Sequence, residues 1–362
     1  MRVCFDYQIF SMQEYGGVSR YYCSLSSEIS KIKGVEARIV APFYINSYLR
    51  MIGSNLVTGI KVPNLSKSAR IRLMANQMCS IPLMAKFSPD IVHETYYLDN
   101  TFAPGNAKRI LTVNDMIHER FYPKHDPTGE LKKKAIKRAD HIICISENTR
   151  RDLLDLHQLP SCKVSVVYLG IDALPNITDN GPSLGILPYI LYVGTRSPYK
   201  NFGALVEAYA SSTWLRNNFR LICFGGGVFT SSEKEMFKSK SIRECQVQQI
   251  CGDDSILAAC YQNAAVFVYP SLYEGFGLPP LEAMTFNCPV ACSNTSSIPE
   301  IVGAAGIYFD PSDIESIREA IENVLQSSDL RADLKERGLL RSKLFSWQKC
   351  ARETTRIYLN VL

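Results

Sequence analysis

Residues 266–290 read VFVYPSLYEGFGLPPLEAMTFNCPV, and this stretch predicts a strand, a glycine turn and a helix in succession. Its first four residues are β-branched or aromatic and end at Pro270, which is the pattern of a buried strand. Gly275 and Gly277 allow the backbone angles of a tight turn that can present amides to a ligand. Prolines 279–280 are tolerated in the first turn of a helix, where no amide partner is lost.

The same stretch places two carboxylates in different settings. Glu274 lies in the loop at the end of the strand, and Glu282 is expected in the first turn of the helix, where the dipole favours negative charge. Ligands of open α/β sheets bind at this end of the strands, so both glutamates are candidate site residues. A strand, a turn and a first-turn glutamate also occur in any α/β protein, and each feature alone leaves a purely structural role open.

A second candidate element lies upstream, where residues 194–201 read GTRSPYKN directly after a predicted strand. The guanidinium of Arg196 can bind two phosphate oxygens at once, and the ammonium of Lys200 supplies a compact second charge. A leaving diphosphate gains negative charge in the transition state, so cations placed there lower the barrier selectively. The alternative is that both residues are ordinary surface cations at the end of a strand.

The chain alternates apolar strands with amphipathic helices, which predicts an α/β protein with parallel, doubly wound sheets. After the first predicted strand, Gly16 and Gly17 precede a helix, and adjacent glycines permit close approach of a diphosphate to a helix start. Residues 173–188 are rich in Pro, Gly, Asn and Asp and lack periodicity. We interpret them as a linker between a first domain, residues 1–172, and a second, residues 189–345.

Composition excludes several classes of protein. Hydrophobic residues make up 46% of the 362 residues and aromatic residues 10%, which excludes a disordered chain. The twelve cysteines lack paired C-x2-C spacings, which argues for reduced thiols rather than a disulfide framework or a zinc site. No apolar run reaches the roughly 18 residues of a membrane span, and the amino terminus lacks the pattern of a signal peptide. We therefore expect a cytoplasmic protein.

The net charge of +5 is concentrated in the first half of the chain. Residues 1–180 contain 23 Lys+Arg and 17 Asp+Glu, a net charge of +6, so the remainder carries −1. Five of the cations fall on one predicted helix: Lys132, Lys133, Lys134, Lys137 and Arg138. Such a run is either a solvated helix face or a surface for anionic lipid or a charged acceptor. No nucleic-acid-binding signature accompanies the charge, so nucleic acid is not an expected partner.

The string EGFGLPPLE at residues 274–282, with its two glutamates eight positions apart, closely resembles the E-x7-E motif of family-four retaining glycosyltransferases. The G-x-R-x-x-x-K-N pattern at residues 194–201 and the paired glycines at 16–17 resemble that family as well. The resemblance implies the GT-B fold. In that fold two Rossmann-like, doubly wound domains face a central cleft, and a carboxy-terminal helix, residues 346–362 here, crosses back to the first domain.

Enzymes of this family transfer a hexose from a nucleotide-diphosphate sugar to a glycan or lipid-linked glycan with retention of configuration. The resemblance therefore implies a retaining glycosyltransferase, and we expect a role in surface polysaccharide or lipopolysaccharide biosynthesis. The basic first domain is compatible with peripheral contact at the inner face of a membrane. No D-x-D triplet occurs in the sequence, so neither a divalent metal ion nor another cofactor is expected besides the sugar donor.

The resemblance also assigns roles to individual residues. The diphosphate would be held by Arg196 and Lys200, aided by Gly16 and Gly17 and by the backbone of Phe276, Gly277 and Leu278. Glu282 would bind the ribose hydroxyls, and Glu274 would face the donor hexose. The loop at Gly252 would pack on the nucleotide base through main-chain groups, which leaves guanine, uracil and adenine undistinguished.

One position departs from the family pattern. Relatives commonly read His-Asp-Leu at the end of the strand at residues 109–113, whereas this chain has Asn114, which keeps a hydrogen-bonding side chain but not a titratable one. Asp115 matches the pattern and is a candidate catalytic residue. Either His118 or His93 could replace the missing imidazole, although each, taken alone, is better explained as a structural or surface histidine.

Four other functions compete with this interpretation. A glycosidase also uses two carboxylates, but nothing else in the sequence resembles a site in which they flank one bond. A sugar phosphorylase or a nucleotide-sugar epimerase could share the GT-B fold. A non-catalytic binding or scaffold protein is the alternative from a different class, and the missing histidine is the only sequence feature that favours it.

Overall fold

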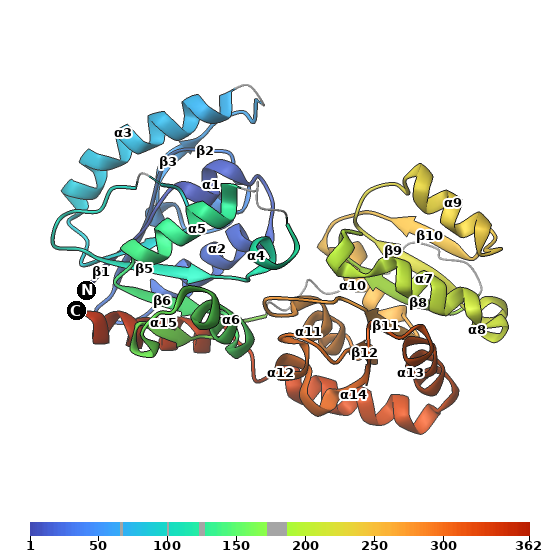
Figure 1. Cartoon of the computed structure of the whole chain (residues 1–362). Coiled ribbons are helices and arrows are strands. Elements are labelled where there is room, and N and C mark those ends of the chain that lie inside the picture. The colour runs from blue at the N-terminus through green and yellow to red at the C-terminus, as the bar shows by residue number, and fades with distance from the viewer. Residues whose placement is uncertain (66–67, 100, 123–126, 172–186) are drawn as a thin grey trace. The chain divides into compact units, whose positions relative to one another are not determined.

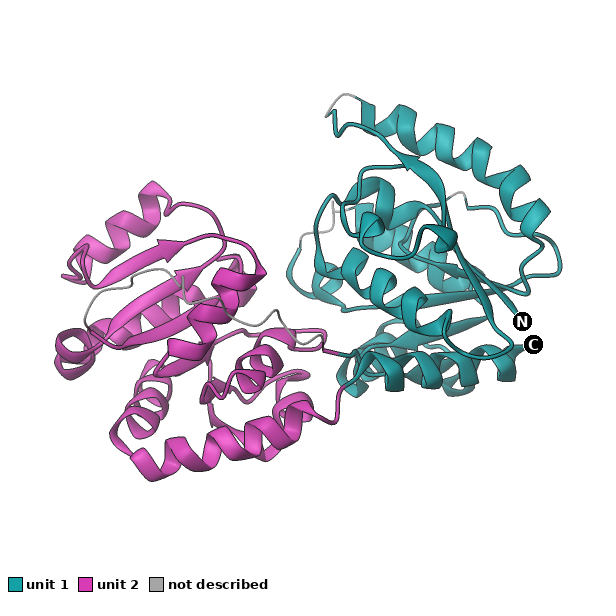
Figure 2. Cartoon of the chain, turned by 180° about the vertical axis from the view of Figure 1, so that it is seen from behind, with its two compact units in different colours: residues 1–170, 346–362 teal, residues 171–345 magenta. Residues whose placement is uncertain are grey.

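A computed structural model of the chain describes residues 1–65, 68–99, 101–122, 127–171 and 187–362. The chain divides into two compact units, of which unit 1 comprises residues 1–170 with 346–362 and unit 2 comprises residues 171–345 (Figure 2). Most of the predicted linker, residues 173–188, lies outside the described residues. The carboxy-terminal helix expected to return to the first domain belongs to unit 1.

Unit 1 is built on a parallel sheet with the order β3-β2-β1-β4-β5-β6-β7 (Figure 1). Its described strands are β1 (Arg2–Phe5), β2 (Glu36–Tyr44), β3 (Val57–Lys61), β4 (Ile91–Glu94), β5 (Lys108–Val113), β6 (His141–Cys144) and β7 (Val164–Val166). The central strands are buried along almost their whole length, as expected where helices cover both faces of a parallel sheet.

The helices of unit 1 connect these strands in βαβ fashion. They are α1 (Gln8–Met12), α2 (Gly17–Ile29), α3 (Ala69–Phe87), α4 (Ile117–Phe121), α5 (Pro127–Arg138), α6 (Glu147–His157) and α15 (Trp347–Val361). Helix α15 starts where Ser346 accepts the Lys349 amide at 3.2 Å, and it packs along α2. Its Tyr358 hydroxyl lies 2.6 Å from His93 Nδ1, so the last helix is bonded to the centre of the first sheet.

Unit 2 repeats the architecture with a parallel sheet of order β10-β9-β8-β11-β12-β13. Its described strands are β8 (Tyr189–Val193), β9 (Arg220–Phe224), β10 (Val247–Ile250), β11 (Val266–Tyr269), β12 (Val290–Ser293) and β13 (Gly306–Phe309). The helices are α7 (Phe202–Ser211), α8 (Thr213–Asn218), α9 (Ser231–Ser239), α10 (Asp254–Asn263), α11 (Leu278–Thr285), α12 (Ile298–Val302), α13 (Ile314–Gln326) and α14 (Ser328–Ser342).

The strand, turn and helix predicted from residues 266–290 are present in unit 2, with one correction. Helix α11 begins at Leu278, capped by Gly277 at a φ of +119°, so its first turn holds the two prolines and no acidic residue. Glu282 therefore lies in the second turn, and the prediction that it sits in the first turn was wrong. The left-handed angle of Gly277 ends the turn one residue earlier than the prolines alone indicate.

Among the described residues, no helix combines the length and apolar character needed to span a bilayer.

Candidate active site

The turn between β11 and α11 is held in shape by the loop that follows β12. The hydroxyl of the buried Ser297 is shared between the carbonyls of Glu274 at 2.9 Å and Phe276 at 2.8 Å. The hydroxyl of Ser296 accepts the Glu274 amide at 3.0 Å. The ring of Phe276 packs edge-on against Phe345 and is buried. A ligand at this turn would therefore meet the backbone of Phe276 and not its ring.

The side chain of Glu274 forms a tight ion pair with Lys200. Lys200 Nζ lies 2.6 Å from Glu274 Oε1, and the two side chains are 14% and 9% exposed. Lys200 ends the short 3-10 helix Pro198–Lys200, which follows β8, so two neighbouring strands deliver the two partners. Such a pair is weakly screened by solvent because it is largely buried.

Tyr269, the last residue of β11, completes this cluster. Lys200 Nζ donates to the Tyr269 hydroxyl at 3.4 Å and lies 5.3 Å from the centre of its ring. Burial and the negative charge of Glu274 raise the pKa of Tyr269 well above its ordinary value, so the hydroxyl stays neutral. An ammonium group has three N–H donors, and within the described residues Lys200 directs two of them at Glu274 and Tyr269. The third can meet an anion.

Arg196 lies on the same sheet edge but has different partners. Its guanidinium is paired with Glu233 and donates to the carbonyl oxygens of Gly225 at 3.1 Å, Gly227 at 3.0 Å and Val228 at 3.0 Å. The side chain is only 5% exposed. In this arrangement Arg196 fixes the loop after β9, and its predicted role in holding a diphosphate stays a prediction.

The partner of Arg196 is itself built into a helix start. Glu233 and Thr230 form a capping box at the amino end of α9, with Thr230 Oγ1 accepting the Glu233 amide at 3.2 Å. Burial acts to raise the pKa of Glu233, but hydrogen bonds from Arg196 and Thr230 outweigh it and hold that pKa below the usual range. The Arg196–Glu233 pair therefore ties the glycine loop after β9 to α9.

Glu282 is oriented by a buried tyrosine from the neighbouring helix. The hydroxyl of Tyr261, on α10, donates to Glu282 Oε2 at 3.1 Å. Tyr261 is fully buried, and burial together with the charge of Glu282 raises its pKa well above the ordinary value. A neutral hydroxyl that donates to one carboxylate oxygen helps to fix the plane of the carboxylate.

Gly252 lies in the loop that links β10 to α10. It is exposed, and a Cβ there would lie 2.5 Å from Ile256 Cδ1. The next residue, Asp253, caps α10 by accepting the amides of Ser255 at 3.0 Å and Ile256 at 3.2 Å. The loop between β10 and α10 is therefore short, and the predicted contact of Gly252 with a nucleotide base stays a prediction.

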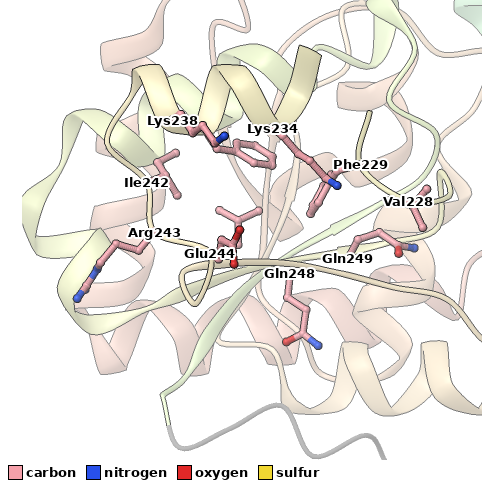
Figure 3. A pocket seen from close by; sticks show the side chains of 11 residues that line it. Val228, Phe229, Lys234, Lys238, Ile242, Arg243, Glu244, Gln248 and Gln249 are labelled. Carbon is pink, nitrogen blue, oxygen red and sulfur yellow. The ribbon is translucent and has the colours of Figure 1, made fainter. Parts of the chain in front are cut away.

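A separate hollow of about 440 Å³ lies between α9 and β10 (Figure 3). Phe229 and Phe237 are among its apolar lining residues, with Lys234 and Lys238 of α9 beside them. The guanidinium of Arg196 lies 4.9 Å from the centre of the Phe229 ring. None of the predicted site residues is among the described lining residues, so this hollow is not the candidate site.

In unit 1, Gly16 and Gly17 stand at the start of α2 as predicted. Gly16 is the residue before the helix and Gly17 its first residue. The side chain of Gln13 lies against this end, with Gln13 Oε1 accepting the Ser19 amide at 3.4 Å. A Cβ on Gly16 would lie 2.3 Å from Gln13 Oε1, whereas a Cβ on Gly17 would meet nothing within 4 Å. A side chain at Gly16 would therefore have to displace the end of the Gln13 side chain, whereas one at Gly17 would meet open space.

Asp115 follows β5 and starts α4. Its Oδ1 accepts the Ile117 amide at 3.0 Å, and its carbonyl oxygen accepts from Lys132 Nζ at 2.9 Å. Lys132 also pairs with Glu119 at 2.9 Å and has a side chain only 1% exposed. One carboxylate oxygen of Asp115 thus shapes the loop. The structure places Asp115 in unit 1 with Gly16 and Gly17, and the other predicted site residues in unit 2.

The two histidines considered as replacements lie in different environments. His93 is fully buried in β4, and its ring nitrogens contact the hydroxyls of Tyr358 at 2.6 Å and Thr112 at 2.8 Å. Burial lowers the pKa of His93 to about 3, so it is a neutral core residue. His118 is partly exposed on α4, with its ring 5.5 Å from that of Tyr122. His118 is therefore the better placed of the two to meet a ligand.

The cation-rich helix predicted from residues 132–138 is α5, but its charges are largely used within the unit. Lys132 is buried against Glu119, Lys134 pairs with Asp99 at 2.5 Å, and Arg138 pairs with Glu94 at 2.6 Å. Lys133 and Lys137 are exposed. The run of five cations is therefore divided, because Lys132 is buried, Lys134 and Arg138 have acidic partners, and Lys133 and Lys137 are exposed.

Among the described residues, no group of three or more His, Cys, Asp or Glu side chains could hold a metal ion. All twelve cysteines are free thiols. Cys288 precedes β12 and Cys292 lies within it, and both are buried in the core.

Each of the two units has a parallel, doubly wound sheet, which is the architecture of the GT-B fold. The family model described as "Glycosyl transferases group 1" matches residues 182–341, and "Glycosyltransferase Family 4" matches residues 15–173. O-antigen chain mannosyltransferase B of Escherichia coli is 31% identical over 281 residues, 73% of each chain. The chain belongs to glycosyltransferase family 4.

Further relatives agree with this assignment. O-antigen chain mannosyltransferase RfbU of Salmonella typhimurium is 25% identical over 86% of this chain and 88% of its own length. Among solved structures, a sucrose-phosphate synthase from Thermosynechococcus elongatus matches with a TM-score of 0.77 at 19% identity, covering 99% of this chain and 98% of its own. HepE of Anabaena, solved with UDP and glucose, matches with a TM-score of 0.75 at 14% identity over the full length of both chains. These structures confirm the predicted fold.

Sequence reasoning missed the residues that position the predicted ones. Tyr261, Tyr269, Ser296 and Ser297 all bond to the two glutamates, their turn or their lysine. Tyr269 could have been found, because it is the last residue of the strand that delivers Glu274. Tyr261 gave no signal, since a tyrosine inside an amphipathic helix is an ordinary core residue.

Proposed function

We propose that this enzyme transfers a hexose, mannose in particular, from a nucleotide-diphosphate sugar to a growing surface polysaccharide or lipopolysaccharide chain, with retention of configuration. The Lys200–Glu274 pair beneath the start of α11 carries the proposal, because it places one cation and one carboxylate where a sugar diphosphate would meet a glycine turn. Mannose is favoured because the similar proteins from Escherichia coli and Salmonella typhimurium are named O-antigen chain mannosyltransferases. The same names favour a glycan acceptor.

In the proposed reaction the bond between the anomeric carbon and the diphosphate breaks. Lys200 neutralises the charge that develops on the leaving phosphate, and Glu274 binds the hexose hydroxyls. The acceptor oxygen attacks the anomeric carbon from the face that the diphosphate leaves, and its proton passes to a phosphate oxygen. Glu282, held by Tyr261, binds the ribose hydroxyls. No protein nucleophile is needed.

We infer further that the reaction proceeds without a divalent metal ion. The ammonium of Lys200 and the helix start at Gly277 provide the positive potential that a metal would otherwise supply to the diphosphate. Arg196 could contribute only after leaving Glu233 and the carbonyls of the glycine loop. We place the reaction in the cytosol, at the inner face of the membrane, in keeping with twelve free thiols.

The test is transfer from GDP-mannose and UDP-glucose to a mannose-terminated oligosaccharide, with and without EDTA, followed by NMR of the product. We expect an α-linked product from the α-linked donor, with EDTA having no effect. A β-linked product, or loss of activity with EDTA, would contradict the mechanism. Conversion of the donor without an acceptor would identify an epimerase, and turnover that depends on phosphate would identify a phosphorylase. If the protein binds no donor, a scaffold role is favoured.

A further inference from the structure

The guanidinium of Arg196 is bound from two directions by partners within unit 2. Glu233 approaches it from the side, with Oε1 accepting from Nε and Oε2 lying 3.4 Å from Nη2. Nη1 donates to the Gly225 carbonyl at 3.1 Å, and Nη2 donates to the Gly227 and Val228 carbonyls at 3.0 Å each. A bidentate contact with a phosphate uses Nη2 together with Nε or Nη1. Arg196 could form such a contact only by giving up these partners.

Leaving these partners would be costly, because the ion pair is largely buried. The side chains of Arg196 and Glu233 are 5% and 15% exposed. The guanidinium also lies 4.9 Å from the centre of the Phe229 ring and 5.8 Å from that of the buried Phe202, and such contacts favour a cation. Turning Arg196 outward would break all of these contacts and leave Glu233 without its cation. The enclosed position of Arg196 is therefore the stable one.

The loop that Arg196 holds lies between two other elements of the predicted donor site. Strand β9 is the parallel neighbour of both β8 and β10 (Figure 1). Parallel strands end at the same edge of a sheet, so the loop after β9 lies between the loops that carry Lys200 and Gly252. Gly226, Gly227 and Val228 are exposed in it. A donor whose diphosphate meets Lys200 and whose base meets Gly252 has to pass over this loop.

The glycine loop, residues 225–228, owes its shape to Arg196. Gly225, Gly226 and Gly227 have φ angles of +85°, +69° and +75°. Glycine permits these angles but also many others, so ordering three glycines in a row costs conformational entropy. The carbonyls of Gly225, Gly227 and Val228 all turn toward one guanidinium, which selects a single shape. Without that guanidinium, we expect a ligand to bear the cost of ordering the loop.

We propose that Arg196 is a positioning residue, which holds the glycine loop in the shape that receives the donor and does not itself contact the diphosphate. Lys200 is then the cation that meets the leaving phosphate. This role replaces the diphosphate contact that the sequence predicted for Arg196. It rests on the proposed function, because the sugar donor is the ligand that the loop receives.

Kinetics separate a positioning role from a direct one. A cation on the diphosphate stabilises the transition state more than the bound donor, so its loss lowers kcat. A preordered loop favours the bound donor and the transition state alike, so its loss raises donor KM. Releasing Arg196 from Glu233 should improve catalysis if the arginine acts on the phosphate, and should weaken donor binding if it acts on the loop.

The test compares donor KM and kcat per folded molecule for wild type, Arg196→Met, Glu233→Gln and the double variant. Arg196→Met should raise donor KM by about tenfold with kcat within about twofold, and the double variant should raise it no further, because both changes remove the same pair. Glu233→Gln should raise KM by less, since it keeps a side chain that completes the capping box of α9. The double variant leaves no buried unpaired charge, so it serves if Arg196→Met unfolds.

The matched control is Glu207→Gln, which breaks the exposed Lys240–Glu207 pair of the same unit and should keep the wild-type KM. A fall in kcat for Arg196→Met, with an unchanged or lower donor KM for Glu233→Gln, would overturn the proposal. A lower melting temperature with unchanged KM and kcat in all variants would overturn it too, because Arg196 would then act on stability alone.

Thermolysin cleavage without donor tests the glycine loop directly, because Val228 is 81% exposed and apolar. Arg196→Met should be cut beside Val228 about tenfold faster than wild type, and Glu207→Gln at the wild-type rate. Equal cleavage of wild type and Arg196→Met would contradict the proposal. Cleavage needs no donor, so a wild type that transfers no sugar while its loop resists cleavage counts against the proposed function and not against the hold of Arg196 on the loop.

Discussion

The two sheets share one architecture, yet the polar residues at their carboxyl edges differ in kind. In unit 1 they lie within or directly after a strand: His93 and Glu94 belong to β4, and Asp6 follows β1. All three are at most 1% exposed. In unit 2 the corresponding residues lie further along the loops, Glu274 after β11 and Lys200 after β8. Glu94 and Asp6 are thus enclosed by partners within unit 1, whereas Glu274 and Lys200 lie on loops beyond the strands of unit 2.

The network of unit 1 is closed on itself. Glu94 is paired with Arg109 at 2.6 Å and with Arg138 at 2.6 Å. Asp6 accepts from Gln8 Nε2 at 2.6 Å and from the Thr95 amide at 2.9 Å. We therefore expect these groups of unit 1 to stabilise the fold. Matched substitutions at the carboxyl edges of the two sheets test whether their roles differ.

The largest effect is expected at the edge of unit 2. Lys200→Met should lower kcat/KM by about 100-fold to 1,000-fold, or about 3–4 kcal/mol, because charge stabilisation of the leaving phosphate is lost. Some stability should be lost too, since Glu274 is left buried without its cation. Lys200→Met/Glu274→Gln should recover stability but not activity, which separates the two effects. If the double variant kept the wild-type kcat/KM, the Lys200–Glu274 pair would have no role in the mechanism.

In unit 1 the largest expected change is in stability. Glu94→Gln removes the charge that two arginines share, and we expect the free energy of unfolding to fall by about 3 kcal/mol. The measurement is urea unfolding at pH 7. kcat/KM per folded molecule should stay within about twofold, unlike that of Lys200→Met. A large loss of kcat/KM with unchanged stability would mean that this edge also acts on substrate.

His93 makes the free energy of unfolding of unit 1 depend on pH. Its pKa is about 3 in the folded state against an ordinary 6.5, so below pH 6.5 the unfolded state binds a proton that the folded state does not. Stability is therefore lost as pH falls from 6.5 toward 3, by up to about 1.4 kcal/mol per pH unit. Burial raises the pKa of Asp6 to about 6, and this group acts in the opposite direction between about pH 6 and 4.

Comparison with His93→Gln isolates the histidine from the aspartate. The variant should be less stable than wild type at pH 7, because the contacts to Tyr358 and Thr112 are perturbed. The difference in the free energy of unfolding between wild type and variant should narrow by about 1 kcal/mol per pH unit as pH falls from 6 to 4, because only the wild type loses stability through His93. Urea unfolding at each pH measures it. A gap independent of pH would show that His93 is not buried as a neutral group.

The smallest effect is expected from Tyr261→Phe. It removes the hydroxyl that orients Glu282 while keeping the ring in the core. We expect donor KM to rise about threefold to tenfold, about 1 kcal/mol, with kcat little changed, because a ribose contact contributes equally to ground and transition states. A fall in kcat at constant KM would place Glu282 at the reacting sugar instead.

Sequence predicted the architecture well because β-branched runs and glycine punctuation are local signals. Strand β11 could be predicted from its own residues. Lys200 and Glu274 could be predicted as site residues from their positions in the loops that follow two strands.

The partners of Arg196 are distant from it in sequence. Glu233 and the carbonyls of the glycine loop follow it by about 30 residues, and they come close to it only because β8 and β9 pair in the sheet. For the same reason the acidic partners of Lys132, Lys134 and Arg138 on α5 were not predicted.

Helix α15 also dictates the order in which the molecule can be completed. Unit 2 is one uninterrupted stretch, residues 171–345, whereas unit 1 needs residues made before and after it. A ribosome therefore synthesises all of unit 2 before it synthesises Tyr358, the hydrogen-bonding partner of His93. The domain that begins first is the last to be finished, and until then helix α2 lacks the helix that packs along it.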